Sequence, residues 1–308
     1  MRVMQRKPGP CTRAALQLAA LVVLTALPLT AACDSTGGSA QFLGRNARDS
    51  IVIGVKSDQP GTGWQTDGYK YSGFDIKVAD ALTKDLHIGK TFSNVPSEDR
   101  VAALTQSDAN HVDLVIATFS ITKERMKRIW FAGPYAETQQ GFLVRRDGPA
   151  VKSLGDLRGK PVCAWNGTVS AEALQNRAQG LGTYEAPTAA QCVDDLRSGR
   201  AAAFSTDQLI LHGFAARYSE LEVVPDVVIG SANYYGVGMA KKDPNGRSNL
   251  RDCRRIRDAL KRYVGTSAWD LDLKTELPLV EQAPDWKTRY RPSPADIDRL
   301  SCTDDVEG

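Results

Sequence analysis

Short apolar runs that end in polar turns recur along the chain and predict buried β-strands. The runs at 51–56, 114–117, 161–165 and 201–205 are rich in Val, Ile and Ala, which is typical of parallel strands covered on both faces. A further strand is expected at 91–95. The runs 141–145 and 234–242 would leave one half of the fold and return to it.

Between these runs, apolar residues at helical spacing predict helices. Phe74, Val78, Leu82 and Leu86 recur every four residues and form one core-facing stripe. Helices are expected to begin near residue 73, after Ser97 as an N-cap, and after Thr122 as an N-cap. The other predicted helices span 152–157, 166–178, 189–198, 208–216, 250–263, 267–276 and 294–301. This alternation of strands and helices predicts an α/β fold with parallel strands.

The stretch 113–135, DLVIATFSITKERMKRIWFAGPY, carries the strongest indication of a binding site. Its apolar run ends in the small hydroxyl residues Thr118, Ser120 and Thr122, and a charged helix follows. Free N–H groups at such a helix start attract anions. Arg125 could hold a carboxylate there through two charge-assisted hydrogen bonds, although an isolated Arg is more often a solvated surface charge.

Four predicted strands end in polar turns, at 56–58, 118–122, 166–168 and 206–207. Ligands of open α/β sheets bind outside the carboxyl ends of strands, so these turns are expected to share one site. Arg125 suits a carboxylate and Asp207 suits an ammonium group, and an amino acid carries both. Asp207 could instead cap the helix that starts at residue 208.

The segment 117–135 resembles a signature of the family 3 extracellular solute-binding proteins, the receptors of polar amino-acid ABC importers. The segment 72–82, SGFDIKVADAL, resembles the family's second signature. The resemblance implies a two-lobed, periplasmic-binding-protein-like fold of type II, with a hinge of two crossover strands. It also implies that Ser120, in the turn, and Arg125, in the following helix, bind the ligand's α-carboxylate. Thr118 lies in the same turn as Ser120 and is included in this candidate site.

In the second lobe, the resemblance implies that the N–H of Gly167 and the hydroxyl of Thr168 meet the same carboxylate and that Asp207 receives the α-ammonium. Lys56 and Arg100 adjoin the crevice together with Asp58 of the first turn. Family members that bind acidic amino acids use basic residues at such positions, but Lys56 and Arg100 could equally be surface charges.

Three further segments, 56–63, 205–218 and 234–243, resemble the glutamate-binding lipoproteins of high-GC Gram-positive bacteria. The expected ligand is therefore glutamate, with aspartate or glutamine as alternatives. Departures leave the ligand's side chain open: Ser57 stands where Phe is expected, Trp165 and Val169 flank the second-lobe turn, and Trp64 is an extra aromatic residue.

By this resemblance, the protein is expected to be a monomer that captures an amino acid by lobe closure and delivers it to a membrane permease, without a cofactor. One alternative is a lipoprotein that senses amino acids for a membrane partner. Another is a dehydratase-like enzyme of the same fold. We do not expect an enzyme, because the sequence contains no nucleophile elbow, P-loop or telling carboxylate pair, and no His stands at the four strand ends.

The N-terminal 1–32 segment predicts an export signal. Four basic residues precede an apolar run at 14–29, and Leu-Thr-Ala-Ala-Cys at 29–33 looks like a lipobox with Cys33 as the lipidated residue. Plain secretion is the alternative. Without this segment, 35 of the 39 basic residues remain against 36 acidic ones, a net charge of −1, which gives no support to nucleic-acid binding.

We expect a flexible tether at 33–49, a first lobe of 50–143 plus 238–308, and a second lobe of 144–237. The mature protein is expected outside the cytoplasm, anchored to the outer face of the cell membrane through Cys33.

Four cysteines remain after the export signal and Cys33, and exported cysteines usually pair. These cysteines are Cys163, Cys192, Cys253 and Cys302, and they can form two disulfides in three different ways. We favour Cys163 with Cys192 and Cys253 with Cys302, because each pair then lies within one lobe and closes a moderate loop. The chain has only three His and no Cys/His cluster, so no metal site is expected.

Overall fold

The computed structural model describes residues 42–43, 50–66, 69–177 and 180–304. These residues all belong to one compact unit, Ser39–Gly308. The predicted export signal, the lipidation site Cys33 and nearly all of the predicted tether lie outside the described residues. Within the described ranges, no helix has both the length and the apolar character that a membrane span requires.

An eight-stranded sheet has the order β5-β1-β6-β11-β7-β10-β8-β9. In one part, β1 pairs in parallel with β5 and β6; in the other, β8 pairs in parallel with β9 and β10. These short strands are β1 (Ser50–Val55), β5 (Gly89–Asn94), β6 (Leu114–Val115), β8 (Pro161–Trp165), β9 (Gly182–Ala186) and β10 (Ala203–Asp207). The two predicted groups of parallel strands are thus confirmed.

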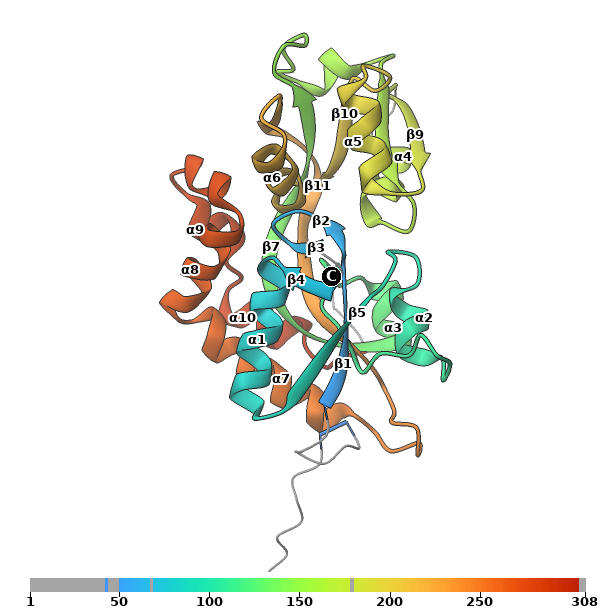
Figure 1. Cartoon of the computed structure of the whole chain (residues 1–308), viewed down its shortest axis with the longest axis vertical. Helices are drawn as coiled ribbons and strands as arrows, with labels where there is room; N and C mark the ends of the chain where they lie inside the picture. The colour runs from blue at the N-terminus through green and yellow to red at the C-terminus, as the bar shows by residue number, and fades with distance from the viewer. Residues whose placement is uncertain (1–41, 44–49, 67–68, 178–179, 305–308) are drawn as a thin grey trace, which may run out of the picture. The chain divides into compact units, whose positions relative to one another are not determined.

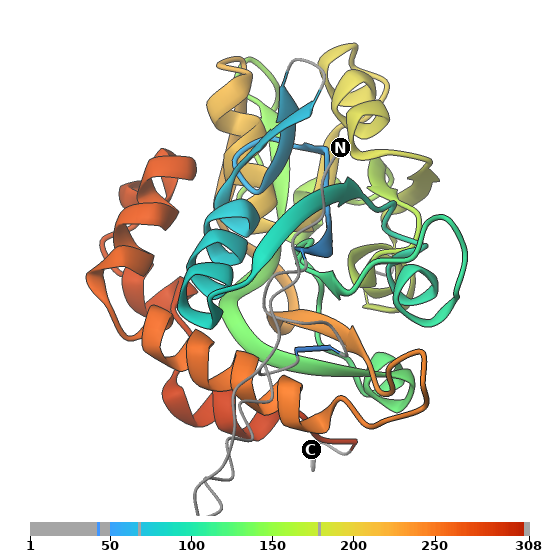
Figure 2. The ribbon, with the colours of Figure 1, turned by 60° about the horizontal axis from the view of Figure 1, so that its bottom comes forward.

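Two long antiparallel strands, β7 (Ile129–Arg145) and β11 (Leu221–Ala240), join the two parallel groups. β11 pairs with β6 of the first group, and β7 pairs with β10 of the second. Figure 2 shows β7 in green and β11 in orange passing through the molecule. The prediction of a two-lobed α/β fold hinged by two crossover strands is confirmed, although the sequence predicted only parts of β7 and β11.

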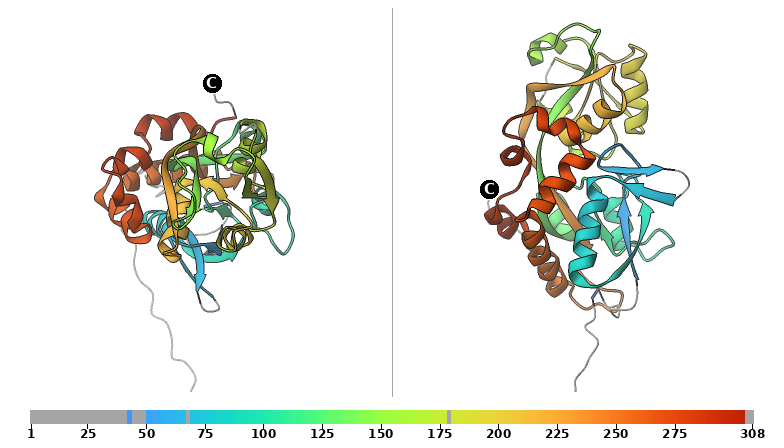
Figure 3. Two further views of the ribbon diagram at one scale, coloured as in Figure 1. Left: turned by 90° about the horizontal axis from the view of Figure 1, so that it is seen from above. Right: turned by 60° about the vertical axis from the view of Figure 1, so that its left-hand side comes forward.

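Helices cover both groups of strands (Figure 1). The second lobe carries α4 (Val169–Arg177), α5 (Ala189–Arg197) and α6 (Gln208–Arg217), with the 3-10 turn η2 (Leu154–Leu157) before β8. The remaining helices are α1 (Phe74–Leu86), α2 (Arg100–Thr105), α3 (Lys123–Arg128), α7 (Leu250–Val264), α8 (Ser267–Glu276), η3 (Pro278–Gln282), α9 (Trp286–Tyr290) and α10 (Pro294–Leu300). Figure 3 shows the C-terminal helices, in red, along one side of the long strands.

Two local predictions are wrong. Ser97 does not cap α2, because the N-cap position belongs to Asp99 and the Ser97 hydroxyl accepts a hydrogen bond from Trp165 instead. The segment after β1, where the sequence predicted only a polar turn at 56–58, contains a small antiparallel sheet of β2 (Asp58–Gln59), β3 (Gly63–Thr66) and β4 (Lys70–Ser72). These strands are two to four residues long, too short for an apolar alternation to reveal them.

Separate apolar clusters support the two lobes. Phe74, Ile256 and Trp269 belong to a first-lobe cluster, whereas Trp165 and Phe204 belong to a second-lobe cluster. Phe142 and Leu143 also pack in second-lobe clusters, while Ala136, Tyr235 and Val237 pack in the first. The lobe boundaries at 143 and 237 remain a proposal, and this packing favours crossings several residues nearer the middle of each long strand.

The predicted disulfides Cys163–Cys192 and Cys253–Cys302 are both present, with Cα–Cα distances of 5.5 and 5.8 Å. The first links β8 to α5, and the second links α7 to the residue that follows α10 by two. The pairing preferred from the sequence is confirmed.

Candidate functional site

Arg125 lies in α3 at the end of the first-lobe segment that contains β6. Thr122 caps this helix as predicted, since its hydroxyl accepts the Arg125 N–H at 3.2 Å. The guanidinium donates from Nη1 to the carbonyl of Ser120 at 2.8 Å and stacks 4.8 Å from the ring centre of Phe119. Among the described residues, this is the only partner of its five N–H donors, so the others remain available for a ligand.

Burial lowers the pKa of Arg125 to about 10, against the opposing influence of the carboxylates Glu172 and Asp207. The side chain therefore stays cationic at neutral pH. A desolvated guanidinium with open donors is a strong site for a carboxylate, because the two charges interact outside bulk water.

Arg100, the first residue of α2, is buried, and unlike Arg125 it uses most of its N–H donors within the protein. It donates to four backbone carbonyls, those of Ser97, Ala117, Thr118 and Gly167. Its guanidinium also lies 4.8 Å from the ring centre of Phe119. Burial and then the positive charge of Arg125 lower the pKa of Arg100 to about 9, so both guanidinium groups remain charged at neutral pH.

Asp207, the last residue of β10, is buried at the start of α6. It holds the N-cap position, but its side chain makes no capping hydrogen bond. Instead, its carboxylate accepts hydrogen bonds from the Tyr235 hydroxyl at 2.7 Å and from the Asn233 amide at 3.0 Å. The alternative that Asp207 is simply a helix cap is therefore not what the geometry supports.

The charges of the two lobes interact. Burial raises the pKa of Asp207, while the hydrogen bonds from Tyr235 and Asn233 and the charges of Arg100 and Arg125 lower it. Asp207 comes from the second lobe, and both arginines come from the first. The structure therefore brings Arg125 and Asp207 within electrostatic reach of each other across the two lobes.

The turn 118–120 presents the backbone toward this site. Thr118 has a left-handed backbone with φ 43°, which a non-glycine residue adopts only when its surroundings hold it there. Its N–H donates to the Asp75 carboxylate at 2.9 Å, and its hydroxyl donates to the side-chain carbonyl of Gln59 at 3.0 Å. The N–H of Ser120, by contrast, has no partner among the described residues. Ser120 lies opposite Tyr235 of β11, and the two hydrogen bonds of this bridge join Ile121 N–H to the Tyr234 carbonyl and Gly236 N–H to the Phe119 carbonyl.

Asp75 supports that turn from below. It is buried in α1, and its other carboxylate oxygen accepts the Tyr135 hydroxyl at 2.6 Å. Burial raises the pKa of Asp75 to about 7, although hydrogen bonds from Tyr135 and Thr118 act in the opposite direction. Asp75 thus positions Thr118.

Lys56 and Asp58 lie together at the end of β1 and in β2. The Lys56 ammonium forms an ion pair with Asp58 at 3.3 Å and donates to the carbonyl of Val95 at 3.4 Å. Burial lowers the pKa of Lys56; the charge of Asp58 raises it and that of Arg100 lowers it. Lys56 is thus not a free surface charge, and it is electrostatically coupled to Arg100.

Direct contacts join the lobes around the site. Arg100 Nη2 donates to the carbonyl of Gly167 at 3.1 Å, and Trp165 Nε1 donates to Ser97 Oγ at 3.1 Å. Gly167 has φ 72°, and a Cβ placed there would lie 2.7 Å from the backbone nitrogen of Glu98. These contacts describe lobes that have closed on each other.

Thr168 serves its own lobe in this conformation. Its hydroxyl donates to the carbonyl of Trp165 at 2.8 Å and accepts the N–H of Ala171 at 3.2 Å at the start of α4. Its role toward a ligand therefore remains a prediction. A crevice of about 220 Å³ lies beside the site, where Thr122 of the first lobe faces Glu172 and Asn233 of the second.

Several residues of this site were missed by the sequence analysis. Phe119 stacks with both arginines, Tyr235 and Asn233 hold Asp207, and Asp75 holds the 118–120 turn. Phe119 alone carried a local signal, because it alternates with Thr118 and Ser120 at the strand end. The others come from distant segments, and only the fold brings them to the site.

Comparison with known proteins gives a consistent result. The family model for bacterial extracellular solute-binding proteins, family 3, matches residues 51–270. The chain is 32% identical over 232 residues to the glutamate-binding protein GluB of Corynebacterium glutamicum, covering 72% of this chain and 78% of that protein. It is 29% identical over 266 residues to the ABC transporter glutamine-binding protein GlnH of Bacillus subtilis, covering 82% and 93%.

Among solved structures, an ancestral arginine-binding protein bound to glutamine matches with a TM-score of 0.64 and 26% identity, covering 74% of this chain and 98% of that one. The solute receptor for L-cysteine of Neisseria gonorrhoeae matches with a TM-score of 0.68 at 21% identity, covering 79% and 96%, and supports the fold alone. The resemblance seen in the signature segments is thus confirmed across most of the chain. The protein belongs to the bacterial extracellular solute-binding proteins of family 3.

Proposed function

We propose that this protein captures an acidic amino acid, with glutamate as the first candidate, and delivers it to the permease of an ABC importer. The observation that carries the proposal is that the half-buried Arg125 and the buried Asp207, charges of opposite sign, come from the two lobes and interact electrostatically. A zwitterion satisfies both at once. The names of the relatives GluB and GlnH support an amino-acid ligand.

The α-carboxylate would bind the open N–H donors of Arg125 and the N–H of Ser120 in the first lobe. Closure would then bring Asp207 onto the α-ammonium and the turn at Gly167 and Thr168 onto the carboxylate. Charge-assisted hydrogen bonds contribute about 1.5 to 3 kcal/mol each, so a few of them offset the cost of ordering a small ligand.

The side chain of the ligand would face the remaining cations. Arg100 is electrostatically coupled to both Lys56 and Arg125, and each of the three cations has an acidic neighbour: Asp58 and Glu98 for Lys56, Asp207 for Arg100, and Glu172 and Asp207 for Arg125. These cations are the groups that a side-chain carboxylate of the ligand could approach. The name of the relative GluB favours glutamate as that ligand.

As a member of an extracellular family, the protein acts outside the cytoplasm. We propose that lipidated Cys33 anchors it to the outer face of the membrane and that it works as a monomer. A sensory lipoprotein would use the same binding chemistry, and a pull-down from membranes would distinguish a permease partner from a signalling partner. We propose no catalytic role and no cofactor.

Titration calorimetry with glutamate, glutamine, aspartate and arginine tests the proposal on the mature protein. We expect glutamate to bind most tightly. Replacing Arg125 by Ala or Asp207 by Asn leaves a buried charge without its partner, which costs about 3 to 5 kcal/mol, so the affinity should fall at least about a hundredfold.

Matched controls carry the same chemical change at exposed positions. Arg128→Ala lies three residues further along α3, and Asp194→Asn lies on α5. Both should bind like the wild type. Wild-type affinity in Arg125→Ala or Asp207→Asn would refute the site, and a clear preference for glutamine or arginine would refute the acidic ligand while leaving the receptor intact.

A further inference from the structure

A second cavity of about 420 Å³ is lined by none of the residues assigned to amino-acid binding. Its walls come from α6 and the first part of β11 on one side and from the segment 279–290, which contains part of η3 and all of α9, on the other. We call it the α6 pocket. A dry cavity of roughly 150 Å³ can hold a benzene ring, so this pocket has room for a ring with a short polar chain.

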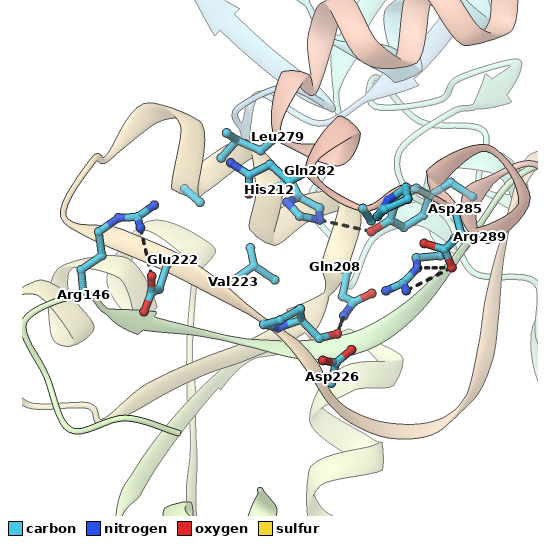
Figure 4. Close-up of a pocket in the computed structure, with 15 residues that line it drawn as sticks. Arg146, Gln208, His212, Glu222, Val223, Asp226, Leu279, Gln282, Asp285 and Arg289 are labelled. Atoms are coloured by element: carbon cyan, nitrogen blue, oxygen red, sulfur yellow. Dashed lines mark hydrogen bonds and ion pairs between the residues drawn. The ribbon is translucent and has the colours of Figure 1, made fainter. Parts of the chain in front are cut away.

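The charged side chains at the two ends of the α6 pocket largely satisfy each other (Figure 4). Arg146 pairs with Glu222 at 2.9 Å, and Arg289 pairs with Asp285 at 3.2 Å. The fifth charged residue, Asp226, is exposed and makes no ion pair with a described residue. The lining therefore has one carboxylate left for an external cation.

Gln208 adds a second unmet acceptor. It is only 1% exposed, its amide nitrogen donates to the carbonyl of Pro225 at 3.0 Å, and its side-chain oxygen has no hydrogen-bond partner. A buried amide oxygen without a donor costs free energy, so a ligand that donates to it is favoured. Figure 4 shows Gln208 between the two ion pairs, with Asp226 below it in this view.

The other walls are apolar or neutral. Val223 and Leu279 face the space from opposite sides, and Ala215 and Ala283 also line it. Burial and then the nearby charge of Arg289 lower the pKa of His212 to about 4, so its ring is neutral at neutral pH and adds no repelling cation. The lining thus offers acceptors and a carboxylate next to an apolar surface.

We propose that the α6 pocket is a second binding site, separate from the amino-acid site, for a small organic ammonium ion with an apolar body. The ammonium group is placed between the Asp226 carboxylate and the Gln208 side-chain oxygen. The apolar body lies against Val223 and Leu279. An anion of the same size finds no unpaired cation in the lining and is excluded.

The test uses 2-phenylethylammonium as the probe, in ligand-observed NMR titrations of the mature protein. The anion 3-phenylpropanoate and the neutral 2-phenylethanol are its matched analogues. We expect saturable binding of the ammonium, about fivefold weaker binding of the alcohol, and no saturable binding of the anion. Asp226→Asn should weaken the ammonium about fivefold, as expected for a carboxylate near the surface.

Two variants separate this site from the amino-acid site. Arg125→Ala should leave the probe's affinity unchanged, and Asp194→Asn is the matched control for Asp226→Asn. Absence of saturation, equal binding of the anion, or loss of binding in Arg125→Ala with Asp226→Asn unaffected would each overturn the proposal. Because the probe has no carboxylate, a failure of the amino-acid assignment would appear only in the calorimetry with glutamate.

Discussion

The hydrogen bond from Trp165 Nε1 to Ser97 Oγ, 3.1 Å long, gives a direct measure of how closure contributes to affinity. Trp165 belongs to the second lobe and Ser97 to the first, so an open form would not make this bond. Any contact made only in the closed form adds to the free energy of ligand binding. Removing this hydrogen bond should therefore lower the affinity for the ligand without changing the residues that bind the ligand.

The magnitude follows from the kind of bond. A neutral hydrogen bond contributes about 0.5 to 1.5 kcal/mol net, so we expect Ser97→Ala to weaken binding between about twofold and tenfold. Trp165→Phe removes the same donor and keeps an aromatic ring near Phe204, whose centre lies 5.6 Å from that of Trp165. The double variant should be no weaker than the more affected single variant, because both changes remove one bond.

The assay is calorimetry with whichever amino acid gives the largest shift in a thermal screen. Denaturation without ligand measures the unfolding free energy that Trp165→Phe loses in the second-lobe core. Comparing the double variant with each single variant then separates this loss from the effect of the hydrogen bond on ligand affinity. If the two single effects add in the double variant, or if neither change alters affinity, then the contact between Ser97 and Trp165 does not contribute to ligand binding and the reasoning fails.

Two further predictions concern residues that support the site. Because burial raises the pKa of Asp75 to about 7, the folded protein keeps this proton more firmly than the unfolded chain does. The protonated carboxyl group's contribution to stability is thus full below about pH 4 and is lost as pH rises toward 7. Between pH 5 and 8 the wild type should lose roughly 2 to 3 kcal/mol of unfolding free energy, and Asp75→Asn should not show this loss. Urea denaturation across this pH range measures the difference, and identical pH profiles for the two proteins would contradict the prediction. For Gly167→Ala, the left-handed backbone at φ 72° strains any side chain, so the free protein should lose about 1 to 2 kcal/mol of stability. The methyl group would also meet Glu98 in the closed form, so ligand binding to the folded protein should weaken at least about tenfold; unchanged affinity in calorimetry would show that the lobes close without this approach.

Much of the fold could be predicted because its signals are local. The apolar runs of β1, β8 and β10 and the four-residue spacing in α1 lie within single segments, and the structure contains all of them. The Thr122 cap was predictable for the same reason. The long strands β7 and β11 were predicted only in part, because Gly133-Pro134 and Gly230 interrupt their patterns while long-range pairing keeps them continuous.

The candidate site divides in the same way. Arg125 and Asp207 stand at strand ends, so their position was predictable from the topology of α/β sheets. The state of Arg100 was not, because its four acceptors come from carbonyls up to 67 residues away in the chain. Nor could the sequence indicate that Asp75 would hold Thr118, a contact across 43 residues that only the folded chain makes.

Each disulfide joins two points of the same half: Cys163–Cys192 within the second lobe, and Cys253–Cys302 among helices that pack with the first. Their loops, 29 and 49 residues long in sequence, restrict the unfolded chain, so oxidation makes each half harder to unfold. Since both covalent links stay on their own side of the crossover strands, they do not staple the halves together. In an oxidising environment the disulfides can therefore stabilise each lobe of such a receptor without preventing the lobes from opening to release the ligand.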